Sequence, residues 1–184
     1  MPKVVSRGQP RETVLRTFRL DKDIVVGVEK VAHEKHTSPN NLVNLLLRDY
    51  LQWGFYYETR GSFSISKRTF QSILDNLSEQ EIHALSVNLH TNAKELALLK
   101  TGKWDLETYL LLADSSKYNG GARTEVKRDG DQYVIIMHHD LGPKYSQLFT
   151  AYHTKILDEF AEDVKAEVSD STVVFSFKSL NHSS

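Results

Sequence analysis

Hydrophobic and polar residues roughly alternate from Thr13 to Leu20, in the segment TVLRTFRL, and the pattern changes at Asp21. A period of two is typical of a β-strand. The residues that follow have helical periods, so this predicted strand has no neighbouring strand in the sequence. Its backbone N–H and C=O groups need partners. We therefore expect it to pair with a segment elsewhere in the chain or with a second chain.

Two helices are predicted after the strand. Asp21 is the expected N-cap of the first, which ends near His36. Ser38 is the expected N-cap of the second, and Pro39 suits its first position, where a missing N–H costs nothing. The apolar face of the second helix is too wide for one partner helix, which indicates cover by a second chain. That face consists of Leu42, Val43, Leu45, Leu46, Leu47, Tyr50 and Leu51.

Further helices are predicted after a junction at residues 54–66. The segment KRTFQSILDNL has the pattern of a short helix. A longer helix begins after Ser78, where SEQE matches a capping box with Glu81 at the third position, and it ends near Thr101-Gly102. Another helix begins at Asp105. This middle part of the chain is therefore expected to be helical.

The last third of the chain has a different pattern. An Asp129-Gly130 turn predicts a hairpin, and Gly142-Pro143 begins a helix of about 20 residues whose apolar stripe runs to Phe160 and Val164. A second hairpin follows across residues 169–171. Residues 133–137 are apolar on both faces, which predicts a central strand covered on both sides. The expected fold class is α+β, with one domain over residues 1–53 and a second, ending in β-β-α-β-β, over residues 60–184.

Composition and charge narrow the class of protein. The chain has 184 residues, 40% hydrophobic and 26% charged, with no cysteine, which excludes disulfides and thiolate sites. The net charge of −1 hides an uneven distribution, because residues 1–20 carry five basic side chains against the single acid Glu12. A basic end suggests binding to a polyanion, with a solvated arm as the alternative. No apolar run is long enough to span a membrane, no signal peptide is seen, and a cytoplasmic protein is expected.

Residues 13–53 resemble the ribbon-helix-helix family, the MetJ/Arc superfamily of DNA-binding proteins. The resemblance rests on TVLRTFRL, the helix start at Asp21, the spacing of the two caps, and SPNNLVNLLLRDYL after the turn. It implies a homodimer in which two strands pair antiparallel and four helices bury the inner face of this ribbon. It also implies that the ribbon enters the major groove of double-stranded DNA.

The resemblance, together with strand alternation, assigns the expected base contacts. Phe18 and Leu20 share the inner side, so Leu15, Thr17 and Arg19 point outward toward base edges. Arg19 suits guanine, whereas Leu15 suits a thymine methyl group. Arg16 falls on the inner side, where an apolar residue is usual, and a slip of one residue would exchange the two faces.

Phosphate contacts are implied in three places. In the family, the N-terminus of the second helix holds a phosphate, and this role falls here on Ser38, Asn40 and Asn41. Arg16 is expected to reach a phosphate from the end of the ribbon. Arg7 and Arg11 of the basic arm would add salt-sensitive contacts. His36 stands where family members often have a glycine, so a left-handed backbone is expected at a residue that tolerates it less well.

A candidate effector site lies in HHDLGPKYS, residues 138–146. Asp140 and Lys144 flank the predicted helix start, and His153 follows in the helix, so an anionic effector would find Lys144 and free N–H groups. A divalent metal is a second interpretation, but His138 and His139 point to opposite faces of a strand. The third is an ordinary strand-to-helix connection. No metal or cofactor is therefore assigned.

The sequence predicts a sequence-specific transcription regulator, with repression as the expected mode. The second domain would assemble dimers into higher oligomers or sense a ligand or protein. The alternatives are an antitoxin-like protein-interaction module and a non-specific architectural DNA-binding protein. No nucleophile elbow, P-loop, zinc-protease helix or dinucleotide fingerprint is present, so no enzymatic activity is expected.

Overall fold

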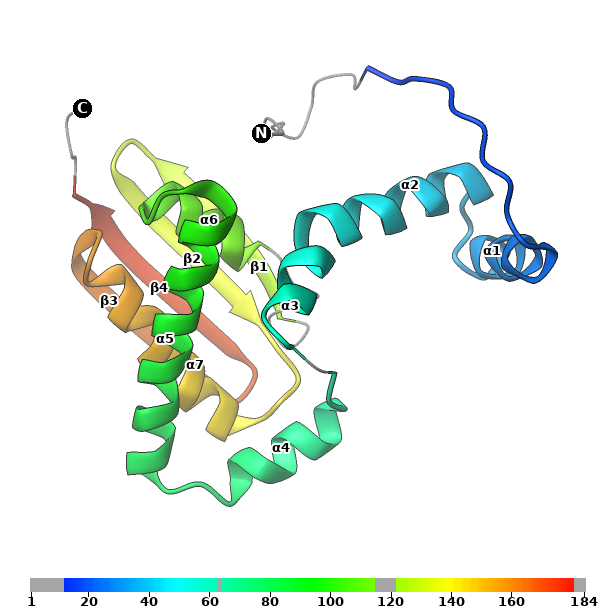
Figure 1. The fold of residues 1–184 in the computed structure, drawn as a ribbon. Helices are drawn as coiled ribbons and strands as arrows, with labels where there is room; N and C mark the ends of the chain where they lie inside the picture. The colour runs from blue at the N-terminus through cyan, green and yellow to red at the C-terminus, as the bar shows by residue number, and fades with distance from the viewer. Residues whose placement is uncertain (1–11, 63, 115–121, 181–184) are drawn as a thin grey trace. The chain divides into compact units, whose positions relative to one another are not determined.

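A computed structural model describes residues 12–62, 64–114 and 122–180 (Figure 1). The chain divides into two compact units, Met1–Tyr57 and Glu58–Ser184, which we call unit 1 and unit 2. The division falls between the two ranges expected from the sequence. The combination of helices with an antiparallel sheet is an α+β fold, as the sequence predicts.

Unit 1 contains two helices at the predicted places. Helix α1 spans Lys22–Glu34 and α2 spans Pro39–Asp49. The predicted junction at residues 54–66 begins too early in the sequence, because the helical backbone continues through a π-helix, Tyr50–Gly54, and α3, Phe55–Thr59. Gly54 keeps a helical backbone, and no proline follows it to end the helix. A Cβ at Gly54 would lie 2.8 Å from the Tyr50 ring, so the close approach of that ring requires glycine.

Residues 12–21, which include the predicted strand, form neither helix nor strand in the single chain. All of them are exposed. The sheet of unit 2 pairs only its own four strands among the described residues, so no partner for this segment is provided within the described chain. Pairing with a second chain therefore stays a prediction.

Unit 2 contains one antiparallel sheet of four strands in the order β1-β2-β4-β3. The strands are β1 Arg123–Asp129, β2 Gln132–His138, β3 Ala161–Val168 and β4 Thr172–Ser179. The first hairpin turns at Gly130, whose φ of 60° suits glycine, and the predicted hairpins and β-β-α-β-β order are both confirmed.

The helices of unit 2 lie on one side of this sheet, packed either against the sheet itself or against another helix (Figure 1). They are α4 Lys67–Asp75, α5 Glu79–Thr101, α6 Leu106–Ala113 and α7 Pro143–Leu157. The predicted capping box of Ser78 and Glu81 is present, and Gly102 ends α5 in the left-handed conformation. The core holds alternate residues of the two central strands: Tyr133, Ile135, Met137, Val173, Phe175 and Phe177.

Two expectations for unit 2 are wrong. Helix α7 ends at Leu157, so Phe160 follows the helix and Val164 lies in β3. The pairing of Ala161 with Ser179 and of Glu162 with Lys178 overrides the helical pattern of these residues. Strand β2 is central, but only its odd-numbered residues are in the core, since Val134 and Ile136 are only half-buried on the other face.

Candidate nucleic-acid interface

The predicted ribbon segment presents all its side chains to solvent in the single chain. Leu15 is 91% exposed, Phe18 71% and Leu20 52%. The predicted base-contact residues Thr17 and Arg19 are exposed as well. Both the expected inner residues, Phe18 and Leu20, and the expected outer residues are therefore accessible to solvent in the described chain.

The helices of unit 1 also expose much of their apolar surface. Ala32 and Leu42 are buried, but large aliphatic side chains on both helices are not. The exposed set on α1 and α2 is Ile24, Val25, Val26, Val31, Leu45, Leu46 and Leu47. Exposed large aliphatic side chains are thus present on both helices of unit 1, and clusters of such side chains mark interaction sites in soluble proteins.

The turn between α1 and α2 has the geometry that the resemblance implies. His36 has a φ of 50°, so the left-handed conformation expected there is observed. The Ser38 side chain caps α2 by accepting a hydrogen bond of 3.2 Å from the Asn41 backbone N–H. The side-chain amide of Asn41 donates to the Thr37 hydroxyl at 2.7 Å, and this holds the turn against the start of the helix.

The other residues predicted to contact phosphates are held by fewer interactions or lie outside the described residues. Asn40 and Arg16 are exposed, and the Asn40 carbonyl accepts a hydrogen bond from the Asn44 side chain. Arg7 and Arg11 lie outside the described residues. Asp21 stands at the start of α1 as predicted, but its side chain makes no capping hydrogen bond there.

The predicted effector residues each have a separate partner in unit 2. Asp140 accepts a hydrogen bond of 2.6 Å from the ammonium group of Lys67 on α4, and this bond lowers the pKa of its carboxyl group. Lys144 donates to the carbonyl oxygen of Leu77 at 3.0 Å. The strand-to-helix connection is therefore tied to α4 and to the turn after it, and Lys144, which was expected to hold an anion, makes an intramolecular contact instead.

His153, the third predicted effector residue, lies in the core. Its ring is 2% exposed and packs among Phe149, Tyr152 and Phe175. Its Nδ1 atom is 2.9 Å from the hydroxyl oxygen of Tyr109, while Nε2 is buried without a hydrogen-bond partner. Burial lowers the pKa of His153 to about 3, so the imidazole is neutral at neutral pH. The prediction of an effector site at Asp140, Lys144 and His153 is not supported by these contacts.

A buried series of side-chain hydrogen bonds next to this turn was not predicted from the sequence. His139 Nδ1 accepts from the Leu141 N–H, so its Nε2–H donates to the Ser146 hydroxyl at 2.9 Å. That hydroxyl donates in turn to the Ser169 carbonyl oxygen at 2.6 Å. Burial lowers the pKa of His139, which agrees with a neutral imidazole ring in this series of hydrogen bonds. The polar side-chain atoms of His139 and Ser146 are all used in hydrogen bonds that join the end of β2, α7 and the second hairpin. Their role is therefore structural.

A second polar cluster surrounds Glu159, directly after α7. Its carboxylate accepts from the Trp104 indole N–H at 2.8 Å, from Lys94 at 3.1 Å and from His90. The spacing of His90 and Lys94 is i, i+4, which places both side chains on one face of α5. That spacing was a usable sequence signal for a shared anionic partner, but it does not name Glu159, which lies 65 residues beyond Lys94.

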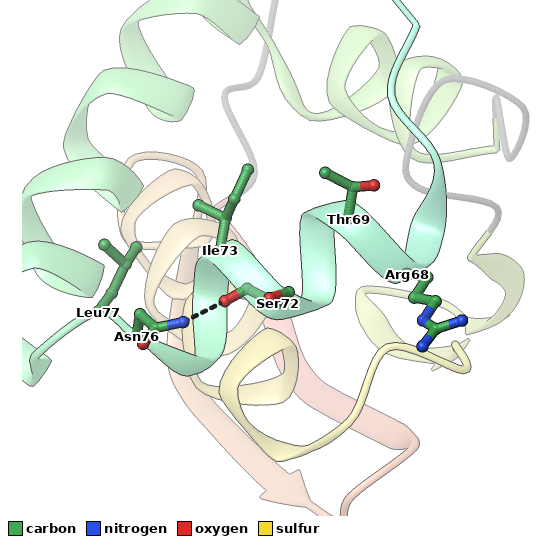
Figure 2. A pocket seen from close by; sticks show the side chains of 6 residues that line it. All are labelled: Arg68, Thr69, Ser72, Ile73, Asn76 and Leu77. Atoms are coloured by element: carbon green, nitrogen blue, oxygen red, sulfur yellow. Dashed lines mark hydrogen bonds between the residues drawn. The ribbon is translucent and has the colours of Figure 1, made fainter.

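An open depression lies on the outer surface of α4 and the turn after it (Figure 2). It is lined by Arg68, Thr69, Ser72, Ile73, Asn76 and Leu77. The side-chain amide of Asn76 donates a hydrogen bond to the carbonyl oxygen of Ser72, so part of the polar lining is already paired. Since it involves none of the predicted effector residues, it gives no support to that site.

The described residues also bear on metal binding and on membrane insertion. Within them, no three histidine or acidic side chains are grouped so that they would hold a metal ion. Their helices include none with the length and hydrophobicity needed to cross a membrane.

The chain was compared with known proteins in three ways. A scan against protein-family models gives no match, and searches of curated proteins and of solved structures return no similar protein.

Proposed function

We propose that the chain is a homodimeric, sequence-specific DNA-binding transcription regulator. In this proposal two copies pair residues 13–20 antiparallel, and the paired strands enter the major groove. The observation that carries it is the segment from Thr13 to Leu20, in which alternating apolar side chains are exposed with no partner in front of two helices that expose their own apolar faces. A second copy would satisfy both the backbone and the side chains.

The electrostatics of unit 1 favour DNA over a purely structural dimer. Arg19 is exposed. In the proposed ribbon it lies on the face opposite to Phe18 and Leu20, where a dimerisation ribbon has no need of a charge. Arg16 lies on the same segment. The left-handed turn at His36 and the cap at Ser38 leave the N-terminus of α2 exposed, which is the geometry that binds a backbone phosphate.

Unit 2 is proposed to assemble dimers or to receive a signal. It has a hydrophobic core of its own, built from all four helices or their flanking turns and the central strands. A folded domain of this kind suits assembly or sensing better than the antitoxin-like alternative, in which a disordered tail folds on its protein partner.

Selection of bound sequences from a random pool of double-stranded DNA tests the proposal. The full chain is expected to enrich a palindromic or directly repeated site, because the ribbon has twofold symmetry. The affinity for the enriched site is then compared with that for random DNA over a range of salt concentrations. A non-specific architectural protein would show a steep salt dependence and little preference between the two. Enrichment of no sequence would contradict the proposal.

A further inference from the structure

The sheet of unit 2 has one face that its described helices leave open. The core takes the odd-numbered residues of β2 and β4, so their even-numbered residues point the other way. We call this the open sheet face. Its central residues are Gln132, Val134, Ile136 and His138 of β2 and Thr172, Val174, Ser176 and Lys178 of β4. Val134, Ile136 and Val174 are half-buried, so aliphatic surface lies at the centre of the open sheet face.

Two neighbouring rows across this face carry opposite charges at both ends. The strand register places Glu125, Ile136, Val174 and Glu167 side by side, and we call this the acidic row. The next row of the same face is Lys127, Val134, Ser176 and Lys165, the basic row. Each row is thus apolar or small at its centre and charged at its two edges.

Most of these charges have no partner of their own. Within the described part of the chain, Lys127, Lys165 and Glu167 make no ion pair, although all three are exposed. Glu125 is paired with Arg123 at 3.0 Å along the same strand, where both side chains are largely accessible. The two rows therefore present unsatisfied charges in a fixed pattern, next to aliphatic surface.

We infer that the open sheet face binds the same face of a second copy of this chain. The copy is turned by 180° about an axis that crosses the strands midway between the two rows. This rotation places each acidic row over the basic row of the partner, so that Glu125 faces Lys127 and Glu167 faces Lys165. Ile136 then faces Val134. The two sheets pack with their strands nearly aligned, about 10 Å apart, a gap that Lys and Glu side chains bridge from both sides.

The outer rows of the face agree with this arrangement. The same rotation brings Arg123 over Asp129, which lie at opposite ends of β1 on the same face. Rotation about an axis along the strands would instead place Glu125 over Glu167 and Lys127 over Lys165, which are like charges. The charge pattern therefore selects one of the two simple twofold arrangements.

The charge balance of the face also argues against a nucleic acid as its partner. A surface that binds a polyanion is dominated by Lys and Arg. Here the acidic and basic rows alternate, and the aliphatic centre offers no phosphate contact. Four strands and four rows would bury on the order of 1,000 Å² in total, at the lower end of specific interfaces. An interface of this size is strengthened when the copies are also joined elsewhere in the assembly.

A crosslinking experiment on the full chain tests the inference. Because the sequence contains no cysteine, Ile136→Cys supplies the only thiol, close to the proposed axis. A short bis-maleimide reagent is expected to convert this variant into a covalent dimer. Ser72→Cys, on the outer surface of α4, is the matched control and is expected to remain uncrosslinked.

Charge exchange decides whether the predicted pairs hold the faces together. In the Ile136→Cys background, Lys127→Glu puts acidic side chains opposite each other and should lower the crosslinked fraction about tenfold. Glu125→Lys alone should do the same with basic side chains. The double variant Glu125→Lys with Lys127→Glu restores opposite charges and should recover the crosslink. Lys165→Glu and its double variant with Glu167→Lys repeat the test at the other edge.

The inference is overturned if Ile136→Cys fails to crosslink, or if the single and double charge variants crosslink alike. It does not depend on DNA binding. The charge variants are expected to retain the affinity of the parent chain for any selected DNA site. If the chain selects no DNA site but its crosslinked fraction changes with charge exchange, the proposed function is contradicted and the sheet interface is supported.

Discussion

The indole N–H of Trp104 donates a hydrogen bond of 2.8 Å to the carboxylate of Glu159. The two residues are far apart in the sequence, and the bond ties the connection between α5 and α6 to the turn between α7 and β3. Partial burial pushes the pKa of Glu159 up, but hydrogen bonds from Trp104, Lys94 and His90 outweigh it, so the pKa lies below its ordinary value. The ionised carboxylate is therefore stabilised in the folded state.

Replacing Glu159 by Gln should destabilise unit 2 by roughly 1–2 kcal/mol, because the amide keeps an acceptor for Trp104 but loses the charge that Lys94 and His90 contact. Urea unfolding followed by Trp104 fluorescence, in a Trp53→Phe background, measures this. Glu162→Gln removes an exposed carboxylate paired with Lys178 and should cost less than about 0.5 kcal/mol. Equal effects of the two substitutions would contradict a special role for Glu159.

The buried imidazole of His153 predicts a loss of stability in acid. Its pKa is about 3 in the folded chain and 6.5 in a model compound, so the unfolded chain binds a proton first as the pH falls. The stability is present above pH 6.5 and is lost as the pH falls from 6.5 toward 3. Between pH 7.5 and 5 this one group should remove roughly 2 kcal/mol from the free energy of unfolding. In His153→Phe this part of the pH dependence should disappear, as urea unfolding at several pH values would show. An unchanged pH dependence would contradict the role assigned to His153.

His36 predicts a stabilising substitution. A side chain with a φ of 50° is strained, and glycine is not. His36→Gly should raise the stability of unit 1 by about 1 kcal/mol. Lys35→Gly is the matched control, because Lys35 has a φ of −91° and gains nothing from glycine. Thermal unfolding followed by circular dichroism compares the two, and greater stability of the Lys35 variant would argue against strain at His36.

The strand register predicts different effects for two neighbouring apolar residues. Phe18→Ser should weaken dimerisation through unit 1, because the resemblance places Phe18 on the inner side of the ribbon. Leu15→Ser should leave dimerisation intact, because it points outward. Sedimentation over a range of protein concentrations distinguishes them. The opposite result would show that the ribbon is shifted by one residue.

The proposed DNA contacts predict two kinds of loss. Arg19→Ala should cost roughly 1–3 kcal/mol at a selected site and relax the preference at one base pair. Arg7→Ala should weaken binding to all sequences alike and reduce the salt dependence. Titrations with the selected site and with single-base variants of it measure both. Unchanged preference in Arg19→Ala would rule out its contact with a base.

Local signals in the sequence located most elements of the fold. Ser38, Ser78 and Asp105 begin helices as predicted, because each side chain accepts a hydrogen bond from a backbone N–H three residues later. The end of α7 was placed too late, because residues 161–164 keep an amphipathic pattern while their backbone pairs with β4. Only the pairing with β4, which is distant in sequence, decides whether these residues form a helix or a strand.

The partners of polar side chains were the hardest feature to predict. Asp140, Lys144 and His153 lie close together in the sequence, yet they contact Lys67, Leu77 and Tyr109. These partners lie on or beside α4 and on α6, elements whose packing against α7 has no signature in the local pattern. The turn at His36 was predictable, since cap and turn chemistry are properties of neighbouring residues.

The sheet order β1-β2-β4-β3 has a consequence for how unit 2 folds. Each outer strand pairs with its neighbour in sequence, so β1-β2 and β3-β4 are hairpins that close on the microsecond timescale. Among the described strands, the pairing of β2 with β4 alone spans α7, and it closes a much longer loop. We expect the docking of one hairpin on the other to be the slow event, with α7 as the linker whose length sets its entropic cost.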